Sequence, residues 1–141
     1  MNRDEHGQTS VLIVGFTIVL LMAVGVVVDA SAAYLQREGL NNLADGAALA
    51  GADEVRGDAV YSGGLGQQVP IDRYVARQAV GEYFRQIGAY DDHPGLRFTI
   101  GIDEGEVVVH VDAPLDLPIT VAGITDTTVG AEAAAVVNVS E

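Results

Sequence analysis

Few side chains in this sequence are of the types that carry catalysis or bind metals, and none is spaced as a known motif requires. There is no cysteine, which excludes disulfides, thiolate zinc sites, iron–sulfur clusters and cysteine catalysis. His6, His93 and His110 lack metal-ligand spacing, and we interpret His110 and Asp112 as a surface pair. No serine stands in the Gly-x-Ser-x-Gly context of a nucleophile elbow. The sequence therefore predicts no catalytic centre, no metal site and no cofactor.

Two acidic turns and one glycine-rich segment are the remaining candidates for a ligand site. Asp91-Asp92 and Asp103-Glu104-Gly105-Glu106 offer carboxylate oxygens, which Ca²⁺ prefers, but neither follows a calcium-loop pattern. Gly63-Gly64-Leu65-Gly66 has no lysine after it and no expected strand before it, unlike a phosphate-binding loop. We interpret the acidic turns as solvated surface and the glycine-rich segment as a loop.

The composition excludes one further class of function. The 141 residues include 20 acidic and 7 basic ones, all of the latter arginine, for a net charge of −13. A nucleic-acid-binding protein needs a basic surface that displaces counterions from phosphates, and this balance argues against one. Apolar residues make up 49% of the chain, which is high for so acidic a sequence and indicates that they are concentrated in one place.

That place is an uncharged apolar run from Val11 to Val28. At about 1.5 Å per residue its 18 residues extend about 27 Å, close to the thickness of a bilayer core. We expect a retained transmembrane anchor over residues 8–28, behind a cytoplasmic leader at residues 1–7. The lipid-facing side chains are expected to include Val11, Leu12, Ile13, Phe16, Ile18, Leu20, Leu21 and Val28.

Other interpretations of the run are a buried helix of a soluble protein and a cleavable secretory signal. Ala30-Ser31-Ala32 has the small-x-small pattern of a signal cleavage site. The run is longer than the 7–15 residues usual for a signal, and its one preceding arginine, Arg3, is matched by Asp4 and Glu5. We therefore favour an anchor in the cytoplasmic membrane, with the N-terminus inside and residues 29–141 outside.

The residues after the run continue the helical pattern as an extension over residues 29–56. This segment has no proline and is rich in strong helix formers. Small residues, here Gly39, Gly46 and Gly51, are typical of sites where another helix approaches closely. Apolar side chains at heptad-like spacing form a stripe that we expect to pack against another helix: Ala33, Leu40, Leu43, Ala47 and Ala50.

The remainder is expected to form an extracytoplasmic head at residues 72–141, after a glycine-rich loop at residues 57–71. A four-residue periodicity predicts a second helix from Asp72 to Gly88, before a break at Asp91–Gly95. Alternation with period two predicts strands over 96–102, 107–111 and 129–139, and a weaker edge strand over 115–121. The fold class is therefore α+β, with a long N-terminal helix, a second helix and a small antiparallel sheet of about four strands.

Two segments give the sequence a recognisable resemblance. The first segment consists of Asp4-Glu5-His6-Gly7-Gln8, the apolar run and Val28-Asp29-Ala30-Ser31-Ala32-Ala33-Tyr34-Leu35-Gln36-Arg37. The second is the alanine-rich Leu40–Ala52, which contains an Asp-x-Ala-Ala-Leu-Ala signature. In this order they resemble the N-terminal region of TadE/TadG-like pilus-assembly proteins, of the tight-adherence (Tad, or Flp) branch of type IV pilus machinery. The resemblance covers residues 3–55.

The resemblance implies a minor pilin or pseudopilin made as a prepilin, whose partners are other pilins and the Tad assembly machinery. In that family a membrane peptidase cuts before the apolar helix, which would make Gly7 and Gln8 the processing site. Type IV pilins usually carry glutamate five residues into the mature chain, and here that position is Leu12. Gly15, Ala23 and Gly25 are small enough for helix contacts in lipid. The alternatives are an anchored binding or envelope-scaffold module unrelated to pili, and a small anchored hydrolase.

Overall fold

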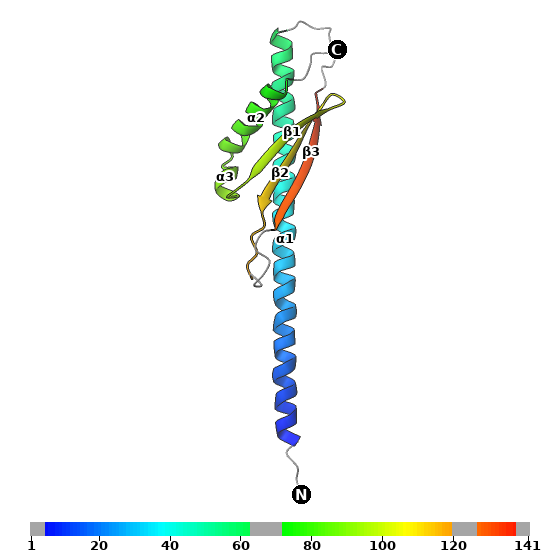
Figure 1. The fold of residues 1–141 in the computed structure, drawn as a ribbon, viewed down its shortest axis with the longest axis vertical. Coiled ribbons are helices and arrows are strands. Elements are labelled where there is room, and N and C mark those ends of the chain that lie inside the picture. Colours follow the sequence, from blue (N-terminus) through cyan, green and yellow to red (C-terminus); the bar gives the residue numbers. More distant parts are fainter. Residues whose placement is uncertain (1–4, 63–71, 120–126, 138–141) are drawn as a thin grey trace. The chain divides into compact units, whose positions relative to one another are not determined.

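The computed structural model describes residues 5–62, 72–119 and 127–137. They form three helices and three strands in the order α1 (Glu5–Ser62), α2 (Arg73–Gln86), α3 (Ala89–Asp92), β1 (Arg97–Asp103), β2 (Glu106–Pro114) and β3 (Thr128–Val136) (Figure 1). The predicted α+β class is confirmed: a long N-terminal helix and a second helix precede an antiparallel sheet.

The chain divides into two compact units, which we describe separately. The anchor unit contains the described residues of Met1–Tyr34 and Asp116–Thr125. The head unit contains the described residues of Leu35–Leu115 and Asp126–Glu141. The helix α1 runs through both units, and the connection between β2 and β3 contributes to the anchor unit.

The helix α1 is longer than the sequence indicates. It continues to Ser62, so the prediction of a loop from residue 57 is wrong for residues 57–62. A glycine inside a helix costs only about 1 kcal/mol, and the turn before Gly57 is held in place by Val55, which is 4% exposed in the core. Residues 63–71 of the predicted loop lie outside the described part of the chain.

The helix α2 begins and ends close to the predicted positions. The Asp72 carboxylate caps it by accepting a hydrogen bond from the backbone N–H of Tyr74 at 2.7 Å. After α2, Gly88 adopts a φ of 71°, a left-handed conformation that glycine takes without steric cost. The chain then forms α3, a single turn that overlaps the break predicted at 91–95.

The sheet has the order β1-β2-β3, and both pairs are antiparallel. Glu104 and Gly105, with φ values of 44° and 90°, form the predicted hairpin turn between β1 and β2. The register places Ile100 opposite Val109, and Val109 opposite Ala133, so the apolar residues of all three strands share one face.

The predicted edge strand at 115–121 is wrong over its described residues. Residues 115–119 form no strand, and 120 and 121 lie outside the described part. Pro114 and Pro118 lack the backbone N–H that a ladder needs. The Leu115 N–H donates to the Thr127 carbonyl at 2.8 Å, and the Ile119 N–H donates to the Asp29 carboxylate at 2.9 Å. The sheet therefore has three strands among the described residues.

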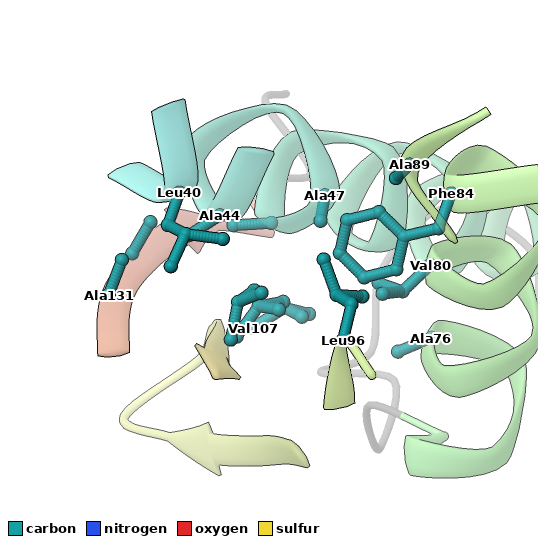
Figure 2. Close-up of a cluster of buried hydrophobic side chains, with 14 of the residues drawn as sticks. Leu40, Ala44, Ala47, Ala76, Val80, Phe84, Ala89, Leu96, Val107 and Ala131 are labelled. Carbon is teal, nitrogen blue, oxygen red and sulfur yellow. The ribbon is translucent and has the colours of Figure 1, made fainter. Parts of the chain in front are cut away.

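The hydrophobic core lies in the head unit, between the apolar face of the sheet and the two helices α1 and α2 (Figure 2). The face of α1 contributes Leu40, Ala44 and Ala47, and all three are fully buried. Phe84 of α2 contacts Phe98 of β1 edge-on, with ring centroids 5.4 Å apart. No polar or charged residue is buried among those that the structure describes.

Two leucines of α1 test whether this helix is a structural part of the head. Leu40 is 0% exposed and Leu49 is 58% exposed. We expect Leu40→Ala to lower the free energy of unfolding by about 2–5 kcal/mol, because it leaves a cavity in the core. Leu49→Ala is the matched control and should change it by less than about 0.5 kcal/mol. Urea unfolding of the detergent-solubilised chain measures both, and equal effects would contradict this packing.

Candidate membrane anchor and helix-packing surface

Most apolar side chains of the run in α1 are exposed in the part of the chain that the structure describes. The predicted anchor side chains are exposed by 41% at Val28 to 74% at Val11. This helix is long and apolar enough to cross a membrane, and its most apolar 18 residues are unburied. A core helix of a soluble protein would be mostly buried, so the exposure fits a surface that faces lipid.

The hydroxyl groups in and beside the run bond to the helix itself. Thr17 donates to the Ile13 carbonyl at 2.8 Å, and Ser31 donates to the Val27 carbonyl at 2.8 Å. A hydroxyl without a partner is costly in hydrocarbon, because no water is available to bond it. These bonds to the carbonyl four residues earlier make both side chains compatible with a lipid environment.

A contact that the sequence analysis missed lies where the apolar run ends. Asp29 is the first charged residue after the run, and its carboxylate accepts the Ile119 N–H from the β2–β3 connection. The Ile119 Cδ1 atom lies 3.5 Å from the position that a Cβ on Gly25 would occupy. Ninety residues separate Asp29 and Ile119, and no local pattern links them.

The predicted processing site lies at the start of α1. Gly7 and Gln8 are helical, two and three residues after the first residue of the helix, Glu5. Their side chains lie outside what the structure describes. Leu12, at the position where type IV pilins usually carry glutamate, is 72% exposed, and no charged residue replaces it within the run.

The predicted packing stripe is occupied largely by the chain's own head. Leu40 and Ala47 are fully buried in the core, and Leu43 packs against it. Ala33 and Ala50 are half-buried. Leu40, Leu43 and Ala47 of the stripe therefore belong to the core of the same chain, and binding another subunit through Leu40 or Ala47 would require opening that core.

Two glycines of the stripe region permit this close packing. A Cβ on Gly46 would clash with the Tyr83 side chain of α2, including a distance of 2.7 Å to Cζ. A Cβ on Gly51 would lie 3.2 Å from both Val107 Cγ1 and Val80 Cγ2. The helix α2 therefore approaches α1 at Gly46, and both α2 and β2 approach it at Gly51, whereas no described residue lies close to Gly39.

The polar clusters of the head lie on its surface. His110 Nε2 lies 3.3 Å from Asp112, which agrees with the predicted surface pair, and His110 Nδ1 lies 3.6 Å from Glu132 on β3. No group of three or more possible metal ligands is found among the residues the structure describes.

The arginines of α2 interact with their own chain. Arg85 donates to the Glu82 carboxylate at 2.7 Å, and this hydrogen bond and the positive charge lower the pKa of Glu82. The Arg77 guanidinium lies 5.5 Å from the ring centroid of Phe98. An open groove runs along this helix, lined by these side chains and by Ala50 and Glu54 of α1.

Comparison with known proteins returns one match. Residues 7–54 match the Tad family model, described as "Putative Flp pilus-assembly TadE/G-like". The match supports the family resemblance over this segment, which contains the apolar run and the α1 part of the core. Searches of curated proteins and of solved structures returned no match.

Two glycines of α1 test the packing surface. No described residue lies within 4 Å of the position that a Cβ on Gly39 would occupy, whereas a Cβ on Gly46 would meet the Tyr83 side chain. We expect Gly39→Ala to stabilise the head by about 0.5–1 kcal/mol through helix propensity. Gly46→Ala should destabilise it by about 1–3 kcal/mol through overpacking, and Tyr83→Ala should remove that added cost. Thermal unfolding of the three single variants and of the Gly46→Ala/Tyr83→Ala double variant measures this, and stabilisation by Gly46→Ala would contradict the close approach.

Proposed function

We propose that this chain is a membrane-anchored minor pilin or pseudopilin that takes part in assembling a Tad/Flp-type pilus and performs no catalysis. The observation that carries the proposal is the double role of α1. Its N-terminal part presents an unburied apolar surface, and its C-terminal part is built into the core of the head. The family match spans both parts, from residue 7 to residue 54.

The exposed apolar run supports assembly through the anchor. In lipid there is no hydrophobic driving force between helices, because the acyl chains are as apolar as the side chains. Helices therefore associate by close packing at small residues. No described residue lies within 4 Å of the position that a Cβ on Gly15 would occupy, and Ala23 is exposed. The face that contains these two residues is the proposed contact with other pilins, whereas Gly25 is occupied by Ile119 of the same chain.

A cut between Gly7 and Gln8 would retain the whole apolar run. The bond lies within the first turn of α1, where backbone N–H groups have no intrahelical partner and unwinding costs little. The chain without residues 1–7 would begin at Gln8 with an uncharged stretch up to Val28. We propose that this product enters the pilus pathway with Leu12 in the place of glutamate.

The N-terminus of the membrane-extracted chain tests this proposal. Mass spectrometry should find a start at Gln8 in cells with the prepilin peptidase, and an uncut N-terminus in cells without it. Gly7→Val should block the cut, because it places a branched side chain at the cleaved bond. Gly15→Val is the matched control and should leave the cut unchanged.

Two other results would contradict the processed-pilin proposal. A start at Met1 or Asn2 in both strains would favour an anchored binding or scaffold module unrelated to pili. A start at Ala33 would indicate a cleaved secretory signal and a free head.

The proposed orientation places the N-terminus in the cytoplasm and the head outside. Cysteine labelling tests it directly, because the chain has no native cysteine. A membrane-impermeant maleimide added to spheroplasts should label Tyr90→Cys, whose parent side chain is 40% exposed on the head. It should not label Asn2→Cys until the membrane is permeabilised. The reverse pattern would contradict the orientation.

A further inference from the structure

We infer that the described part of the connection after β2, residues 116–119, makes a second membrane contact, in which Ile119 inserts into the boundary between lipid headgroups and acyl chains. The inference rests on the membrane anchoring in the proposed function, and it requires no pilus. Its basis is the contact between this connection and α1 within the anchor unit.

The depth of the contact follows from the helix geometry. Ile119 Cδ1 lies against Gly25, which is inside the apolar run, four residues before Asp29. At about 1.5 Å per residue, the Ile119 side chain reaches about 6 Å below the level of the Asp29 backbone. Apolar side chains that anchor a protein at a membrane surface lie about 5–10 Å into this boundary.

The sequence on both sides of Ile119 is uncharged. From Leu117 to Thr125 the sequence has no charged residue, although charged residues make up 19% of the chain. Acidic residues flank the uncharged stretch at Asp116 and Asp126. Ile119 itself is 45% exposed, so the contact with α1 leaves much of its side chain available to lipid.

Asp29 fixes the connection at this level. Its carboxylate satisfies the Ile119 N–H at 2.9 Å, which would otherwise need water near a lipid surface. On the same helix, Tyr34 lies about 7.5 Å beyond Asp29 and is 67% exposed. Tyrosine is enriched at membrane–water interfaces, so the interface is expected between these two levels of α1.

Fluorescence quenching in vesicles tests the inference on the full chain. Ile119→Cys, labelled with an environment-sensitive fluorophore, is reconstituted in phosphatidylethanolamine–phosphatidylglycerol vesicles that contain brominated lipid. The matched control is Ile87→Cys, because this head isoleucine is 42% exposed. Val19→Cys, in the middle of the apolar run, verifies that the anchor is inserted.

We expect several-fold stronger quenching at position 119 than at position 87, with blue-shifted emission. Strong quenching at position 19 together with equal quenching at 119 and 87 would overturn the inference. That result would leave the pilus proposal intact, because no pilus component is present. Weak quenching at position 19 would contradict the anchoring on which both proposals depend.

Two variants at Asp29 test the positioning role of its carboxylate. Asp29→Asn keeps an oxygen acceptor of the same size and should preserve the quenching at position 119. Asp29→Ala removes the acceptor and should reduce that quenching toward the level at position 87. Undiminished quenching in Asp29→Ala would show that Asp29 does not hold Ile119 at the membrane.

Discussion

The structure depends on one constraint: a single helix must be compatible with lipid in its N-terminal part and with a protein core in its C-terminal part. Before Asp29, the apolar side chains of α1 are largely exposed among the described residues, and lipid is the medium that suits them. From Leu40 to Val55, the same helix is buried against the sheet and α2. Its alanines and glycines allow the sheet and α2 to approach closely, so the head cannot form its core without the helix that anchors it.

Much of this arrangement is predictable from the sequence, because periodicity is a local property. The alternation of valines in β2 reports which face is buried. In α2 the repeat of Val75, Ala79, Tyr83 and Ile87 predicts the helix but not the centre of its buried face. The buried residues are Ala76, Val80 and Phe84, and Ile87 is 42% exposed. The failures occur where a local pattern competes with a distant partner. Leu115 and Ile119 have strand-like neighbours, but their N–H groups bond to Thr127 and Asp29 instead of to a strand.

The apolar stripe on α1 shows the same limit from another direction. Heptad-like spacing identifies a face that must be covered, and it contains no information on what covers it. Leu40 and Ala47 are covered by their own chain. We therefore propose that another pilin contacts the exposed apolar run, where Gly15 and Ala23 lie, instead of Leu40 and Ala47 in the head.

Hydrogen–deuterium exchange of the full chain in lipid nanodiscs, at increasing urea, tests the double role of α1 most directly. The amides of residues 40–55 should lose protection together with those of β2, because both belong to one core. The amides of residues 11–28 should stay protected at the same urea concentration, because lipid shields them. Persistent protection of residues 40–55 after β2 exchanges, or rapid exchange of residues 11–28, would contradict this account.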